Sequence, residues 1–225
     1  MAIVTRPGPY NLGQREAFRQ SVGKEDVMKY GEATMGQFEA VINKLGGMDG
    51  LQRFLNDEMI VRAVEFLKFN DKVTLGGIQK FVARDAFGEN NADSIKFYLW
   101  PDFQDNYLGK IEENVGSATV AVHQLEKPLR DDRIMAELGI DLKTKKGVIK
   151  LAHFREMLKA QAQGQEGPLL VNGYANIVYI EDEKGVFWAV HADWSSSGRE
   201  WGIDANSLGS PNEWHGGNQV LSQVS

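Results

Sequence analysis

The chain of 225 residues contains no cysteine, which excludes disulfide bonds, thiolate zinc sites and cysteine nucleophiles together. It also lacks any run close to the roughly 18 apolar residues that a membrane-spanning helix needs. Its first residues lack the apolar core of a signal peptide, so we expect a cytoplasmic protein with no membrane partner. Basic residues are outnumbered, 25 against 31 acidic ones, and this balance makes nucleic acid an unlikely partner.

The common catalytic and nucleotide-binding motifs are missing as well. There is no HExxH zinc motif, no GxSxG elbow, no P-loop and no GxGxxG loop. The chain has four histidines, and no two of them stand four residues apart. The acidic run at 181–183 lacks the spaced oxygen ligands of a calcium loop and is typical of a solvated turn. These patterns predict no cofactor and no metal.

What the chain does have is an aromatic and acidic C-terminal part. Residues 166–225 hold four of the five tryptophans. The same residues include eight acidic and two basic side chains, so they carry a charge of −6, which equals the net charge of the whole chain. An aromatic, acidic surface of this kind is suited to binding a neutral or a positively charged ligand.

Composition along the chain predicts an α+β fold with an N-terminal helical hairpin, a mixed α/β middle and a C-terminal antiparallel β-meander. The glycines and the proline between 164 and 173 suggest a boundary, although 61–225 could equally form one domain. The predicted regions are a flexible arm (1–13), a helical segment (14–60), a mixed α/β region (61–165) and a Trp-rich, acidic antiparallel β region (166–225).

The helical hairpin is predicted from apolar spacing. Five apolar residues from Met35 to Leu45 fall on one helical stripe, and Thr34 precedes them as a cap. Two glycines end this helix, and a second one is expected at about 49–57. We expect the second helix to turn its apolar residues inward: Leu51, Phe54 and Leu55.

The middle region mixes both kinds of spacing. A strand is expected before a turn at 70–72, and a helix of about three turns is expected over Ile78–Ala86. A strand at 95–99 should stop at Pro101, which cannot donate to a sheet. A helix near 130–138 should start at two aspartates, whose charge suits the helix dipole. Tyr98, Trp100 and Tyr107 form a possible aromatic cluster around the proline.

The C-terminal region alternates apolar and polar residues, which is typical of strands. Alternation puts Trp188 and Trp194 on one face of the second strand, and His191 and Asp193 on the other. Trp188, Trp194 and Trp201 are most simply core residues, whereas Trp214 lies in a loop and is the best candidate for an exposed ring. The four predicted strands are Asn176–Asp182, Val186–Asp193, Glu200–Ser207 and Asn218–Gln223.

These features predict a binding site at the end of the C-terminal sheet. Its candidate residues are Trp214, Trp194, Asp193, His191 and Glu200. Indole rings can pack on sugar faces or on cations, and carboxylates accept hydrogen bonds from either.

Three functions remain open. The first is a noncatalytic binding or interaction protein, with a protein partner (another protein or the chain itself) or a carbohydrate as ligand. The second is a self-assembling structural protein that uses the N-terminal arm and the exposed aromatics. The third is a small hydrolase in which an acid acts with His191 or His123.

Several blocks of the sequence resemble a family of short, modular bacterial proteins. The blocks are 43–55 (NKLGGMDGLQRFL), 81–87 (FVARDAF), 106–112 (NYLGKIE) and 172–180 (NGYANIVYI), followed by Trp201, 205–207 (ANS), Pro211, Trp214 and 217–220 (GNQV). The chain departs from the family's ending at Leu221 and Gln223, where phenylalanine and arginine are expected. The resemblance implies a widespread modular family and brings no activity, fold or ligand with it.

Overall fold

The computed structural model describes residues 34–58 and 65–224. The chain divides into two compact units, Met1–Ala63 and Val64–Ser225. The described residues form six helices and nine strands, which confirms the predicted α+β class. The predicted arm, 1–13, lies outside the described residues. The glycine-rich stretch 164–173 lies inside the second unit, where it joins a helix to a strand.

In the first unit two short helices, α3 (Met35–Lys44) and α4 (Met48–Leu55), follow one another. Thr34 caps α3 as predicted, because its Oγ1 accepts from the backbone N of Gln37 at 3.3 Å. The Gln37 side chain in turn accepts from the backbone N of Thr34 at 2.7 Å, which completes a capping box. Gly47 lies between the helices with φ of 86°, a conformation that glycine adopts without strain.

The apolar stripe of this hairpin is exposed, so the prediction of an inward face is wrong. No residue of α3 is buried. Phe54 and Leu55 of α4, both expected inside, are 41% and 65% exposed, and Leu51 is half-buried. Helices of ten and eight residues are too short to cover each other's apolar sides, because two such helices leave most of their surface open.

The second unit is built on a seven-stranded mixed sheet with the order β1-β5-β9-β6-β7-β8-β3. Strands β2 (Ile78–Val82) and β4 (Ile111–Val115) pair separately as a small antiparallel sheet. The strands of the large sheet are β1 (Leu67–Leu75), β3 (Phe97–Leu99), β5 (Ala118–Leu125), β6 (Asn176–Glu181), β7 (Phe187–Ser195), β8 (Glu200–Ser207) and β9 (Gln219–Val224).

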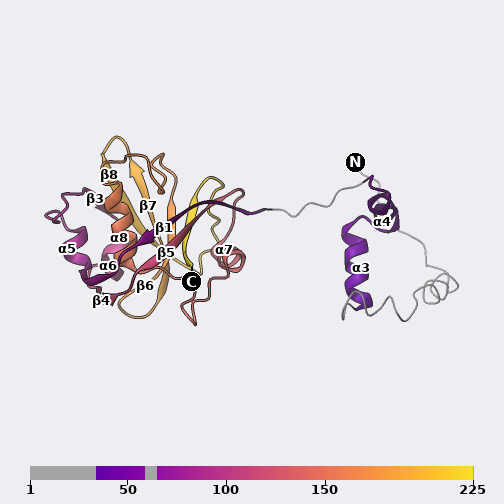
Figure 1. Ribbon diagram of the computed structural model, residues 1–225, viewed down its shortest axis with the longest axis horizontal. Coiled ribbons are helices and arrows are strands. Elements are labelled where there is room, and N and C mark those ends of the chain that lie inside the picture. The colour runs from indigo at the N-terminus through magenta and orange to yellow at the C-terminus, as the bar shows by residue number, and fades with distance from the viewer. Residues whose placement is uncertain (1–33, 59–64, 225) are drawn as a thin grey trace. The chain divides into compact units, whose positions relative to one another are not determined.

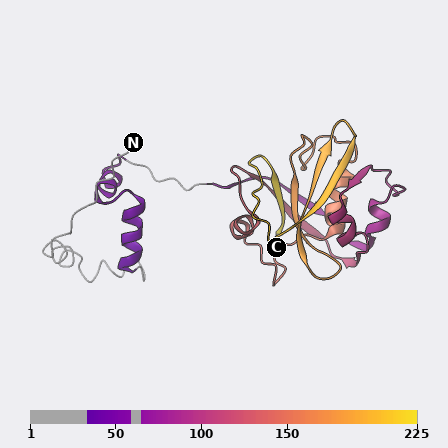
Figure 2. The same cartoon turned by 180° about the vertical axis from the view of Figure 1, so that it is seen from behind.

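Helices lie on both faces of the large sheet (Figure 1). On one face, which we call the α8 face, α5 (Ala83–Phe87), α6 (Pro101–Tyr107) and α8 (Leu151–Ala160) enclose the larger apolar core. On the other, the α7 face, α7 (Asp131–Leu138) covers a smaller core. The view from behind shows the same separation (Figure 2). The central strands are therefore apolar on both sides.

The last strand departs from the predicted meander. Strands β6, β7 and β8 are consecutive antiparallel neighbours, as predicted. Strand β9 does not follow β8 in the sheet but lies between β5 and β6, antiparallel to the first and parallel to the second. Val220 and Leu221 are fully buried and belong to the cores on opposite faces, which explains the central position of their strand.

Two expectations for the middle region are wrong. Residues 70–72 lie within β1, where a register shift between Phe69 and Asp71 marks a β-bulge, and they form no turn. The stretch Ile78–Ala86 is not one helix, because its first five residues form β2 and pair with β4. This pairing outweighs the helical spacing of the apolar residues, as tertiary contacts often do.

Candidate functional site

The five residues predicted as a site do not all lie together. His191, Asp193 and Trp194 belong to β7, Glu200 opens β8, and Trp214 lies between β8 and β9. Strand alternation turns His191 and Asp193 to the α7 face and Trp194 to the α8 face. The ring of Trp214 contacts that of His191, with centroids 5.1 Å apart and planes at 71°. The structure therefore groups three of the five residues.

Trp194 is a core residue and drops out of the site. Its side chain is 7% exposed and packs edge-on against Trp201, with ring centroids 5.3 Å apart. Gly164 lies so close that a Cβ at its position would overlap with the indole. The prediction that these tryptophans fill the core is confirmed for Trp194 and Trp201, whereas Trp188 is half-buried and donates its Nε1 proton to Asp182 at 3.0 Å.

Glu200 lies at the tip of the β7–β8 hairpin, opposite Ser195. It lines a hollow of about 740 Å³ together with Lys96, Phe97 and Gln104, at the edge of the sheet. None of the other four predicted residues lines that hollow. Glu200 therefore belongs to the rim of the surface rather than to its centre.

A histidine and two carboxylates lie at the centre of the candidate site. The register pairs His191 with Asp204 and Asp193 with Gly202, on the α7 face of the hairpin. Burial lowers the pKa of His191, and the nearby Asp204 and Asp193 carboxylates offset only part of that shift. Burial raises the pKa of Asp193, opposed by His191 and reinforced by Asp204. The imidazole is therefore uncharged at neutral pH, so it does not compensate the negative charge of the two neighbouring carboxylates.

Trp214 is held in place by a buried aspartate. Its Nε1 donates to Oδ1 of Asp131 at 2.8 Å, and the hydroxyl of Tyr179 donates to the same oxygen at 2.9 Å. The backbone of Trp214 also pairs with that of Leu129. Trp214 is half-buried, so the prediction that its ring is exposed is confirmed only in part. It presents one side to solvent from a fixed position.

Two exposed aromatics extend this surface, Tyr98 in β3 and Trp100 directly after it. Tyr98 pairs with Gly202 in a parallel ladder, so it faces the same side as Asp193. Tyr98 and Trp100 are 51% and 45% exposed, and their rings meet edge-on at 5.0 Å. Tyr107, the third member of the predicted cluster, is buried instead and donates to the carbonyl of Ile180 at 2.8 Å. We call the resulting surface the aromatic–acidic face: Tyr98, Trp100, His191, Asp193, Asp204 and Trp214.

His123 and His191, the two histidines considered for a hydrolase, lie apart from each other. His123 lies on the same face as His191, but β9 and β6 separate their strands. Three strand spacings correspond to about 14 Å, which is beyond the reach of a shared proton. Burial lowers the pKa of His123, whose ring packs against Phe69 at 5.5 Å.

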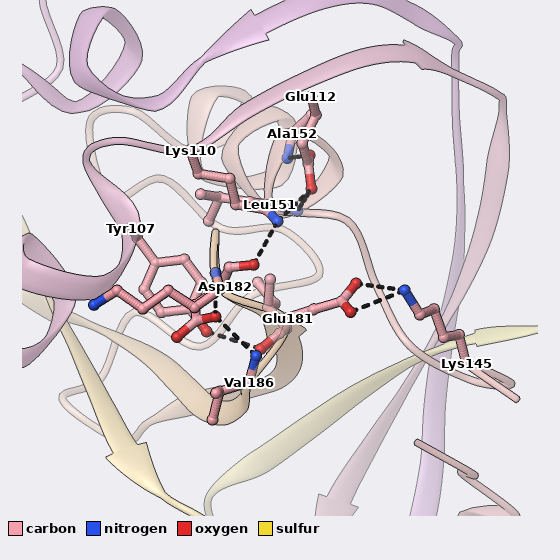
Figure 3. Close-up of polar contacts among 11 residues, drawn as sticks. Tyr107, Lys110, Glu112, Lys145, Leu151, Ala152, Glu181, Asp182 and Val186 are labelled. Atoms are coloured by element: carbon pink, nitrogen blue, oxygen red, sulfur yellow. Dashed lines mark hydrogen bonds and ion pairs between the residues drawn. The ribbon is translucent and has the colours of Figure 1, made fainter. Parts of the chain in front are cut away.

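The acidic side chains at the end of β6 and in the turn after it are hydrogen-bonded to other groups of the chain (Figure 3). Both carboxylate oxygens of Glu181 accept from Nζ of Lys145, at 2.7 and 2.9 Å. Oδ1 of Asp182 accepts from the backbone N of Lys184 and of Val186 at 2.8 Å each. Within residues 34–58 and 65–224, no three His, Asp or Glu side chains are grouped as a metal ion would require.

Comparisons with protein-family models, with curated proteins and with solved structures find no match to this chain. Across the described residues, no helix is long and apolar enough to cross a membrane. The fold and the surface thus define an α+β protein whose large sheet carries an aromatic, acidic face.

Proposed function

We propose that the protein is a noncatalytic binding protein whose aromatic–acidic face takes up a positively charged segment of a partner protein. The observation that carries this proposal is the composition of the face. Asp193 and Asp204 lie between the exposed Tyr98–Trp100 pair and the fixed ring of Trp214. Carboxylates attract lysine and arginine, and aromatic faces attract the same cations. Tryptophan and tyrosine are also frequent anchors of protein interfaces.

The shape of the face favours a protein over a small sugar. Sites for small molecules are usually concave, whereas none of the six residues lines either of the hollows of about 740 and 520 Å³ in the second unit. A broad sheet face suits the flat contact typical of two proteins. The charge of −6 on residues 166–225 also favours encounter with a basic partner.

Asp204→Asn and Asp193→Asn are each expected to weaken binding of an oligolysine peptide by about tenfold, which is roughly 1.4 kcal/mol. Each substitution removes one negative charge and keeps the size of the side chain. Isothermal titration calorimetry at low and at moderate salt measures the effect, and the affinity of the unchanged protein should fall as salt screens the charges. Asp71→Asn, on the far edge strand β1, is the matched control and should bind like the unchanged protein.

Equal losses in Asp71→Asn and Asp204→Asn would show that only net charge matters, which contradicts a localised site. Binding of a neutral oligosaccharide without binding of oligolysine would instead support the carbohydrate alternative. Trp100→Ala should weaken binding of either ligand, because it removes an exposed ring outside the core.

A second function, self-assembly, is favoured by the exposed apolar stripe of the first unit. Met35, Phe38 and Val41 of α3 are each about half exposed or more, and such a stripe is typical of a face that packs against another helix. Phe38→Asp is expected to convert any larger species to a single chain of 25.1 kDa in light scattering. Glu39→Ala, an exposed change on the same helix, should leave the mass unchanged. A single-chain mass for the unchanged protein would exclude this function.

A further inference from the structure

A second hollow lies at the start of α8, away from the aromatic–acidic face. It has a volume of about 520 Å³, and no residue of that face lines it. Its lining comes from β4, from the turn that follows β4, and from the beginning of α8. The size is within the range of about 300–1,000 Å³ that small-molecule sites occupy.

Glu112 and Lys110 both line this hollow, and Figure 3 shows their polar contacts. Oε2 of Glu112 accepts from the backbone N of Ala152 at 2.9 Å, and Oε1 accepts from that of Leu151 at 3.4 Å. Nζ of Lys110 lies 3.7 Å from Glu112 and donates to the carbonyl of Asp182 at 3.3 Å. The first backbone amides of α8 therefore already donate hydrogen bonds to the Glu112 carboxylate. That carboxylate is in turn paired with the ammonium group of Lys110. An incoming anion would meet Glu112 in the place where helix amides would otherwise attract it.

His153 is the unusual member of the lining. It is 1% exposed, and neither Nδ1 nor Nε2 has a hydrogen-bond partner. A neutral imidazole carries one donor and one acceptor, so a group that both accepts and donates would satisfy it. Burying such a side chain without partners is costly, and most buried polar groups in proteins have a hydrogen-bond partner. His153 is one of the residues that line the hollow, so a bound molecule that displaces its neighbours slightly would meet the ring.

We propose that this hollow binds a small uncharged molecule that carries hydroxyl or amide groups, with His153 as a direct hydrogen-bonding contact. The charged residues of the lining are balanced, because it contains two lysines and two glutamates: Lys110, Lys150, Glu112 and Glu113. A balanced lining gives no net attraction to an anion or a cation, whereas a hydroxyl or an amide can both donate and accept. This proposal concerns a different part of the second unit from the proposed protein-binding face and does not depend on it.

The test follows the ring nitrogens of His153 by long-range ¹H–¹⁵N spectra of the full chain labelled at histidine. The probes are glucose, glycerol and acetamide, with acetate and inorganic phosphate as charged comparisons. We expect saturable movement of the His153 resonances with at least one uncharged probe and none with the anions. His153→Gln assigns the signals, and single variants of the other three histidines assign them by elimination if that protein does not fold.

A blocking variant makes the result specific. Gly116 lines the hollow, and a Cβ at its position meets nothing within 4 Å. Gly116→Trp should therefore fold and lower the affinity for the uncharged probe by about tenfold or more, because the indole narrows the opening. Gly76→Trp, an equally open position outside the hollow, should bind as before. Unmoved resonances with every uncharged probe, equal binding in Gly116→Trp, or stronger binding of acetate or phosphate would each overturn the proposal.

Discussion

Replacing Asp131 by alanine is expected to lower the free energy of unfolding by about 3 kcal/mol, since two buried donors lose their acceptor. Asp131 is 5% exposed at the start of α7, and its Oδ1 accepts from the hydroxyl of Tyr179 and from Nε1 of Trp214. In Asp131→Ala the Tyr179 hydroxyl and the Trp214 Nε1 group are still removed from water on folding, but no hydrogen bond compensates for their lost hydration. Urea denaturation followed by tryptophan fluorescence measures the loss.

Asparagine at the same position separates the hydrogen bonds from the charge. Its side-chain oxygen can accept from Trp214 and Tyr179, so Asp131→Asn should be close in stability to the unchanged protein at neutral pH. Equal destabilisation by alanine and by asparagine would show that these hydrogen bonds do not carry the effect.

The pH dependence of Asp131 has a definite sign. Burial raises the pKa of its carboxyl, and the hydrogen bonds from Trp214 and Tyr179 oppose this shift only in part. The carboxyl therefore contributes its full stability below its unfolded pKa of about 3.9 and loses it as pH rises through the higher folded pKa. Relative to Asp131→Asn, the unchanged protein should lose stability over that interval. A constant difference between the two proteins from acid to neutral pH would contradict a raised pKa.

The same contact links stability to the proposed function. Trp214 belongs to the aromatic–acidic face, and its indole is fixed by Asp131. Asp131→Ala should therefore weaken oligolysine binding as well, whereas Asp131→Asn should keep it. This pairing distinguishes a pre-positioned ring from one that orders only on binding, because the latter would make the two variants equal in affinity.

Local alternation was enough to predict much of the C-terminal sheet. The spacing from Trp188 to Trp194 assigns His191 and Asp193 to one face and the indoles to the other, and the register of β7 with β8 agrees. Short polar turns define the hairpin, so pairing between neighbours in sequence follows from residues close together in the chain.

Contacts between distant segments could not be predicted in this way. Tyr98 joins the acidic residues only because β3 pairs in parallel with β8, about one hundred residues later in the chain. The sequence indicates that Asp131 starts a helix, but its partners Tyr179 and Trp214 lie 48 and 83 residues away. The sequence indicates that His153 is an ordinary helix residue. Only the structure shows that its ring nitrogens lack hydrogen-bond partners and that the residue lines the hollow.

The second large effect is expected at Gly164, where alanine should lower the free energy of unfolding by about 3 kcal/mol through backbone strain and overpacking together. Gly164 has φ of 67°, a conformation unfavourable for residues with a Cβ. The added Cβ would also overlap with the indole of Trp194, which is buried and packs edge-on against Trp201. Thermal or urea unfolding measures the change.

Gly139→Ala supplies the matched control for this prediction. Gly139 has nearly the same backbone conformation, with φ of 62°, but a Cβ there meets nothing within 4 Å. It should cost about 1 kcal/mol from strain alone, so the difference between the two variants isolates the contact with Trp194. Equal losses would show that the ring yields easily and is not fixed in the core. A Trp194→Phe variant that binds oligolysine with unchanged affinity would then complete the argument, because a core tryptophan contributes to folding without contributing to the aromatic–acidic face.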